Sequence, residues 1–273
     1  MTKAFFANWL GAFADGWAVA RAMPWLVAVM MGIEFAQHAV ELHLGFFSVD
    51  SAVRRAASEE PLRMMFGWPK MLAVYAVAFF ATRWLVTRDT RVALRPSARA
   101  CRNYLGVMLF LAIPAAAMIH ARAILSLIGF SEPEVVPFRM IFGLFSLLAE
   151  PLLLLWIVNA AMGTEGHGPA AFVRTTGWLY FYALLLLFVT RVPVTQLHAR
   201  LNLWPAGQTP AVQWAMFALD ALVVGVLTVV VPAIQVRIAR LIADRRQVPL
   251  PGAKPVAVER PARRLHASHA VAR

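Results

Sequence analysis

The chain has 273 residues, of which 60% are hydrophobic and 15% are charged. Soluble domains carry about 25% charged residues, so this composition excludes an ordinary water-soluble globular protein as well as a disordered one. The formal net charge of +12 comes largely from basic residues that flank apolar runs, which indicates anionic lipid head groups rather than nucleic acid as the charged partner.

Residues 1–22 predict an amphipathic helix ahead of the first membrane span. An aromatic side chain recurs at every fourth position of this segment, at Phe5, Trp9, Phe13 and Trp17. This spacing places one aromatic stripe along a helix. We expect the helix to lie on the inner surface of the membrane, with Lys3, Asn8 and Asp15 facing water. Packing of the stripe against the membrane bundle is the alternative.

Six apolar runs follow, and each is long enough to cross a hydrocarbon core of about 30 Å, which takes about 20 helical residues. They comprise residues 23–47, 68–87, 104–129, 138–162, 175–197 and 210–238. Their apolar character is continuous rather than alternating, which favours helices over the strands of a membrane barrel. We therefore predict an all-α, polytopic membrane helix bundle with six transmembrane helices over residues 23–243.

The positions of lysine and arginine predict the orientation of this bundle. These residues are concentrated on the side that holds both termini, above all in the loop between the second and third spans and after the sixth span. Basic loops favour the cytoplasmic side of a membrane. We expect a multi-pass protein of the bacterial inner membrane with both termini in the cytoplasm.

Residues 244–273 predict a flexible, disordered basic tail. This segment contains many arginines and four prolines, Pro249, Pro251, Pro255 and Pro261. Such a composition cannot build an apolar core. The tail is expected either to lie on anionic lipid, at about 1 kcal/mol per basic residue close to the surface, or to bind no particular partner.

Ionisable residues inside the predicted spans are the candidates for function. An uncompensated charge at the centre of a membrane helix costs about 2.5–3.5 kcal/mol on insertion scales. The candidates come from five of the six spans and are Glu34, His38, Glu41, His120, Glu150, Arg191 and Asp220. The first three have the spacing i, i+4, i+7 and must share one helix face. We expect that face to point at protein or at a water-filled cavity.

Two interpretations of these residues remain open. In the first, they form a proton or cation relay in which carboxylates and a histidine titrate close to one another. In the second, they form an internal network that stabilises the bundle. Arg191 then pairs with Asp220 or Glu150, and His38 pairs with one of the two glutamates on its own helix face.

A metal site built from Glu34, His38 and His120, with Glu41 as a further ligand, is a third interpretation. The chain has no HExxH motif, and its one cysteine excludes a centre built from several cysteines. We therefore predict neither a metal nor another cofactor.

Prolines interrupt predicted spans at Pro114, Pro151 and Pro232. A proline inside a helix removes a backbone hydrogen bond and commonly kinks the helix. Glu150 directly precedes Pro151, which places a carboxylate at a predicted kink.

Three segments together carry a resemblance to a known group. They are an amphipathic opening that runs into a span (AFADGWAVARAMPWLVAVM), a second basic helix start (RACRNYLGVMLFLAIPAA) and a last helix that ends in a basic run (ALDALVVGVLTVVVPAIQVRIARLIADRR). The chain resembles the YciC-like group of bacterial six-helix membrane proteins, which includes the membrane domain attached to some glycerophosphodiester phosphodiesterases. The resemblance implies a helical membrane bundle. It carries no catalytic signature, so it assigns no residue a role.

Two functional classes follow from these observations. The chain has no GxSxG, P-loop or dinucleotide-binding motif, which argues against an enzyme. The first class is a non-enzymatic membrane subunit or accessory protein, with a membrane-protein partner or a second copy of the chain. The alternative is a small proton- or ion-coupled transporter or channel. It would use an intramembrane band made of Glu34, His38, Glu150, Arg191 and Asp220.

Overall fold

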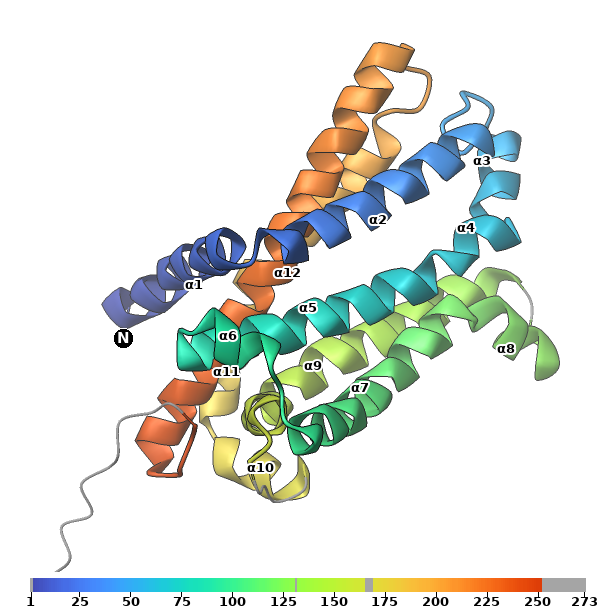
Figure 1. Cartoon of the computed structure of the whole chain (residues 1–273). Coiled ribbons are helices and arrows are strands. Elements are labelled where there is room, and N and C mark those ends of the chain that lie inside the picture. The colour runs from blue at the N-terminus through green and yellow to red at the C-terminus, as the bar shows by residue number, and fades with distance from the viewer. Residues whose placement is uncertain (1, 131, 165–168, 252–273) are drawn as a thin grey trace, which may run out of the picture.

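The computed structural model describes residues 2–130, 132–164 and 169–251, and these residues form helices, turns and loops without a strand (Figure 1). The helices are α1 (Thr2–Ala22), α2 (Pro24–His43), α3 (Ser51–Ser58), α4 (Pro61–Met65), α5 (Gly67–Thr87), α6 (Thr90–Leu94), α7 (Ala98–Ile119), α8 (Ala121–Leu127), the 3₁₀ turn η1 (Glu132–Glu134), α9 (Val135–Met162), α10 (Pro169–Thr176), α11 (Leu179–Leu203) and α12 (Pro210–Arg246). The prediction of an all-α protein is confirmed.

Six helical stretches in the described part of the chain are long and apolar enough to cross a membrane. They are Pro24–His43, Pro61–Thr87, Ala98–Ile119, Val135–Met162, Leu179–Leu203 and Pro210–Arg246, of which the second combines α4 and α5. Each overlaps one of the six predicted spans. The chain therefore has the architecture of an integral, multi-pass membrane protein.

The ends of the third span differ from the prediction of 104–129 because local backbone chemistry, and not hydropathy, sets them. The hydroxyl of Ser97 accepts a hydrogen bond from the backbone N–H of Ala100 at 3.1 Å, so the helix begins at Ala98 and includes the basic residues that follow. At the other end, the backbone of His120 leaves the helical conformation, with φ −97° and ψ 17°. This break separates α7 from the short helix α8.

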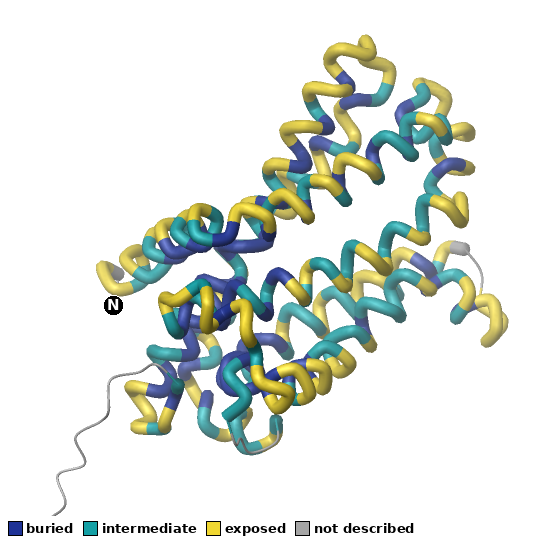
Figure 2. The backbone as a smooth tube through the Cα atoms, viewed as in Figure 1, coloured by how far each residue is buried: buried dark blue, intermediate teal, exposed yellow. Residues whose placement is uncertain are grey.

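The bundle is built around α12. This helix packs against α1, α2, α5, α9 and α11, whereas α7 packs mainly against α9. The larger apolar core takes residues from α1, α2, α5, α9, α11 and α12, and a smaller core joins α5, α7 and α9. Buried positions are concentrated where α1, α5 and α12 meet (Figure 2). Helix α12 thus holds in place the spans that carry the polar candidates.

The aromatic stripe of α1 packs against the bundle, which is the alternative that the sequence left open. Phe5, Trp9 and Phe13 contact the larger core, and two small residues of the same helix, Ala12 and Val19, are fully buried in it. The fourth aromatic residue departs from this pattern, because Trp17 is 64% exposed.

Two polar residues of α1 contact the bundle, whereas the sequence predicts that they face water. The amide of Asn8 donates a hydrogen bond to the hydroxyl of Tyr182 at 3.0 Å. Asp15 is buried, and its two carboxylate oxygens accept hydrogen bonds from Arg88 and from Arg237, each at 2.6 Å. These ion pairs neutralise the Asp15 carboxylate and attach α1 to residues that follow α5 and to α12.

The last helix continues beyond residue 238, where the apolar run ends. It extends to Arg246, and the buried side chain of Leu250 still belongs to the larger core. The packed structure therefore continues past residue 244, the predicted start of the tail. Residues 252–273, which carry most of the predicted tail, lie outside the described residues.

Candidate intramembrane ion site

Three ionisable residues of α2 share one helix face, as their spacing predicts. Glu34, His38 and Glu41 are each 0% exposed. Proline at position 24 begins the helix with the backbone angle that a first helical turn needs, and no proline or glycine interrupts the roughly two turns from Glu34 to Glu41. The face points into the bundle and not toward lipid.

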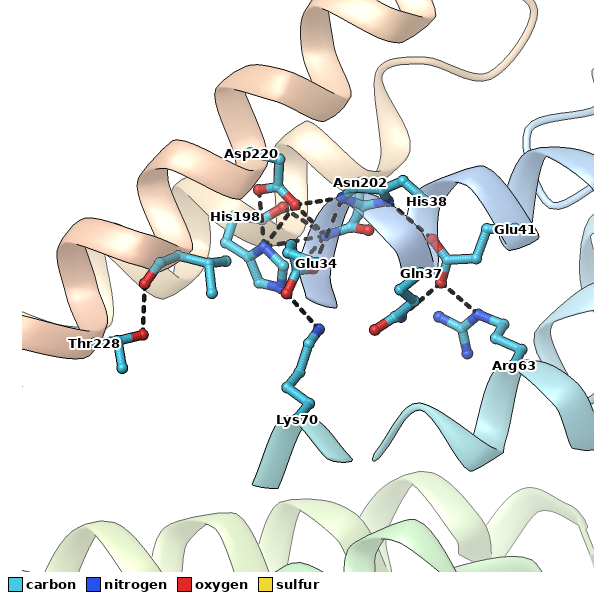
Figure 3. A network of polar contacts seen from close by, with 11 residues as sticks. Glu34, Gln37, His38, Glu41, Arg63, Lys70, His198, Asn202, Asp220 and Thr228 are labelled. Carbon is cyan, nitrogen blue, oxygen red and sulfur yellow. Dashed lines mark hydrogen bonds and ion pairs between the residues drawn. The ribbon is translucent and has the colours of Figure 1, made fainter. Parts of the chain in front are cut away.

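The imidazole of His38 links α2 to α12. Its Nδ1 lies 3.0 Å from Oε2 of Glu41, and its Nε2 lies 2.8 Å from Oδ2 of Asp220 (Figure 3). The ring is stacked on Phe217, with centroids 4.9 Å apart and planes inclined by 15°. Both ring nitrogens therefore contact carboxylate oxygens inside an apolar surrounding.

Helix α11 adds two residues to the same network. Nδ1 of His198 lies 2.8 Å from Oδ1 of Asp220. The amide of Asn202, one helical turn later, donates to the backbone carbonyl of His198 at 3.0 Å and to Oδ2 of Asp220 at 3.3 Å. A continuous set of polar contacts thus runs from Glu41 through His38 and Asp220 to His198, across three helices.

Two basic residues supply the permanent positive charge of this network. Nε of Arg63, in α4, donates to Oε1 of Glu41 at 2.8 Å. Nζ of Lys70, in α5, lies 2.6 Å from Oε2 of Glu34. Figure 3 shows Lys70 extending from α5 toward Glu34. Both basic side chains are partly exposed, whereas the carboxylates that they neutralise are buried.

Glu34 has fewer partners than the other carboxylates of the network. Apart from the ammonium of Lys70, its one ionic contact among the described residues is with Nε2 of His38, which lies 3.7 Å from Oε1. Oε1 is buried and accepts no hydrogen bond from any described residue. A buried carboxylate oxygen without a donor is costly, and this makes Glu34 the least satisfied acid in the network.

A second polar cluster joins α9, α11 and α12. The guanidinium of Arg191 donates two hydrogen bonds to the carboxylate of Glu150, at 2.5 and 2.8 Å. The amide of Gln235 donates to the same carboxylate at 2.7 Å. Arg191 therefore pairs with Glu150 and not with Asp220. This cluster is balanced in charge, because one carboxylate faces one guanidinium.

A cavity of about 640 Å³ lies between the two clusters. Most of its wall is apolar, and the charged residues on its wall are Glu34, Lys70, Glu150 and Arg191. His198 also lines it and connects it to Asp220. The predicted band of intramembrane polar residues is therefore two clusters that share one cavity.

One predicted candidate lies outside both clusters. His120 is exposed at the break between α7 and α8, and its ring packs on Trp68 at a centroid distance of 5.6 Å. A metal site that combines His120 with Glu34 and His38 is thus not formed. The histidine that lies beside Asp220 and lines the cavity is instead His198, which directly follows the predicted end of the fifth span at residue 197.

The structure adds polar residues that the sequence interpretation left out, namely Arg63, Lys70, His198, Asn202 and Gln235. Helix periodicity could have indicated one of them, His198, because it lies seven residues after Arg191 and therefore on the same face of α11. Lys70 and Arg63 lie near the start of the second span, where basic residues are usually interfacial anchors.

Comparison with protein families, characterised proteins and solved structures gives no match to this chain. The likeness to the YciC-like group stays a prediction. Function is therefore argued from the geometry of the two clusters and the cavity alone.

Proposed function

We propose that the protein is a non-enzymatic membrane transporter of the bacterial inner membrane, and that it moves a cation through the cavity beside Glu34 and His198. Both termini then lie in the cytoplasm, as the distribution of lysine and arginine predicts. The observation that carries the proposal is a buried polar network that has more carboxylates than permanent cations and reaches the cavity through Glu34 and His198.

The excess follows from the composition of the first cluster. It contains three buried carboxylates, those of Glu34, Glu41 and Asp220, and two permanent cations, Arg63 and Lys70. Neutral histidines would leave one negative charge without a counterion, whereas a protonated His38 balances it, because it can donate from both ring nitrogens to the carboxylates of Glu41 and Asp220. An uncompensated buried charge is expensive inside a membrane. A further cation, either a proton or a metal ion, completes the charge balance of the cluster.

The surroundings of the excess charge suit passage of an ion. Polar contacts continue from His198 to Arg63, which is 23% exposed at its side chain. Helices α7, α9, α11 and α12 each contain an internal proline, namely Pro114, Pro151, Pro193 and Pro232. Prolines in membrane helices free backbone carbonyls and allow helices to bend beside a binding cavity.

Cation flux into proteoliposomes tests this proposal. Asp220→Asn removes the central negative charge while keeping the shape of the side chain, and His120→Gln is the matched control outside both clusters. We expect flux in the wild type and in the control, and a fall of about tenfold or more in Asp220→Asn, since loss of one charge-assisted contact is worth at least about 1.4 kcal/mol. Wild-type flux in a folded Asp220→Asn protein would overturn the proposal.

A membrane subunit or accessory protein is the other functional class, and it predicts a stoichiometric partner protein. Native mass spectrometry of gently extracted protein distinguishes the two classes. A transporter that acts alone is expected as a monomer or a homo-oligomer with bound lipid. Persistent copurification of a different protein in a fixed ratio would contradict the proposal of an autonomous transporter.

A further inference from the structure

We infer that Glu34, His198 and Asp220 form a binding site for a divalent transition-metal ion of the Zn²⁺ class at the wall of the cavity. The inference rests on the proposed function in one respect, because it names the cation that the transporter would carry. Metal binding itself can be measured without any transport assay.

The positions of the three donor side chains support this assignment. One carboxylate oxygen of Glu34, one carboxylate oxygen of Asp220 and one ring nitrogen of His198 all lie within 4.8 Å of one another. Ligands of tetrahedral zinc, at about 2.1 Å from the ion, are about 3.4 Å apart. Side-chain movements of about 1 Å would therefore bring the three donors to coordination distance.

The unsatisfied oxygen of Glu34 is independent support for a ligand at this position. Glu34 is fully buried, lines the cavity and has a carboxylate oxygen without a hydrogen-bond donor among the described residues. Native proteins rarely leave such an atom unpaired unless another ligand binds it. A metal ion on the cavity side of Glu34 would supply that missing partner.

A divalent ion preserves the charge balance of the network when it displaces the ammonium of Lys70 from Glu34. The two carboxylates of the site carry two negative charges, so a divalent ion with a neutral His198 gives a neutral complex inside the membrane. Lys70 alone provides only one positive charge. Its ammonium is carried by a flexible stem, and Lys70 also lines a second cavity of about 1400 Å³, into which the ammonium could move when a metal ion displaces it from Glu34.

Neighbouring side chains contact the donor residues and orient them, as the outer partners of metal ligands usually do. Asp220 contacts His38, whose other ring nitrogen contacts Glu41. Asn202 donates to Asp220 as well. Such partners orient the ligands and restrict their protonation state. Three protein ligands also leave one coordination position toward the cavity, which an ion must have if it is to enter and leave.

The donor set selects the class of metal. Imidazole nitrogen suits Zn²⁺, Cu²⁺, Fe²⁺ and Ni²⁺, whereas carboxylate oxygen alone would favour Mg²⁺, Ca²⁺ or Mn²⁺. Imidazole and carboxylate ligands occur together in zinc sites that keep an open coordination position. Co²⁺ can replace Zn²⁺ as a coloured probe of coordination geometry.

Equilibrium dialysis of the purified full-length protein against Zn²⁺, followed by elemental analysis, tests the inference. The tail contains His266 and His269, so all samples carry His266→Ala and His269→Ala to remove binding outside the bundle. We expect one Zn²⁺ per chain, and a visible absorption band on loading with Co²⁺. His198→Gln should weaken Zn²⁺ binding about tenfold or more, whereas the control His120→Gln should leave it unchanged.

A variant with the opposite expected effect keeps the test informative if a ligand variant fails to fold. Lys70→Met removes the ammonium that competes with the metal ion for Glu34, so the affinity for Zn²⁺ should rise about tenfold. Equal Zn²⁺ binding by the wild type, His198→Gln and Lys70→Met would show adventitious binding and overturn the inference.

The result separates the two proposals. If the wild type binds no Zn²⁺ but shows cation flux that depends on Asp220, the metal assignment fails and the proposed function stands. If one Zn²⁺ binds through His198 but no cation is transported, the site stands and the proposed function fails.

Discussion

Replacing Arg191 by glutamine removes the only guanidinium that neutralises Glu150 within the described part of the chain. The carboxylate is nearly buried, and after the substitution it keeps only the hydrogen bond from Gln235 at 2.7 Å. Removing one partner of a fully buried ion pair costs about 3–5 kcal/mol. The side chain of Arg191 is 28% exposed, so solvent already weakens the pair. We therefore expect the free energy of unfolding to fall by about 2–3 kcal/mol.

The companion variants make the expectation specific to this pair. Glu150→Gln leaves the charge on Arg191, which can reach toward solvent along its flexible stem, so we expect a smaller loss of about 1–2 kcal/mol. The double variant contains two neutral amides that can bond to each other, and it should be more stable than Arg191→Gln alone. Unfolding of all four proteins with a denaturing detergent in mixed micelles gives the four free energies. A double variant that loses the sum of the two single losses would refute the pairing argument.

Two further predictions concern the packing that supports the site. Asp15→Asn should weaken the attachment of α1, because it removes the charge that pairs with Arg88 and Arg237. We expect faster proteolysis within α1 and a loss of about 1–2 kcal/mol in a chemical unfolding assay, and an unchanged cleavage rate would contradict it. Gly163→Ala should lower the melting temperature, because Gly163 has φ +70° and a Cβ there would lie 2.9 Å from the backbone nitrogen of Ala100. The control Gly106→Ala, in an open helical position, should be neutral or stabilising by up to about 1 kcal/mol, and equal destabilisation of both variants would refute the steric argument.

Hydropathy was sufficient to predict the six spans, because each is a continuous apolar run of the length that a bilayer requires. It did not place their ends. The third span begins at Ala98 because Ser97 caps it, and it ends where the backbone breaks at His120. Neither event changes the local hydropathy. The last helix extends through basic residues to Arg246 because arginines are good helix formers, although they do not look like membrane residues.

The periodicity of α1 left its location undecided for a different reason. A stripe of aromatic residues has the same spacing whether it faces lipid or protein. The contacts that decide are long-range, because Asp15 pairs with Arg237 at the other end of the chain. No local pattern contains that information.

The candidate site was predicted in part. The common face of Glu34, His38 and Glu41 follows from helix geometry. Which acid each basic residue pairs with depends on the order of the helices around α12, and hydropathy does not specify that order. His198 was missed because the apolar run ends at residue 197, whereas the helix continues to Leu203. Lys70 was missed because a lysine near the start of a span is usually an interfacial anchor.

The central position of α12 also constrains how the protein is made. It is the last of the described helices to leave the ribosome, yet α1, α2, α5, α9 and α11 all pack against it. Until it inserts, His38 has no Asp220 and Asp15 has no Arg237 beside it. The earlier spans must therefore enter the bilayer with polar faces that still lack their partners. We expect insertion of the bundle to need machinery that shelters these faces until α12 enters the membrane, and we expect a nascent chain that stops before residue 210 to be recognised by membrane quality control.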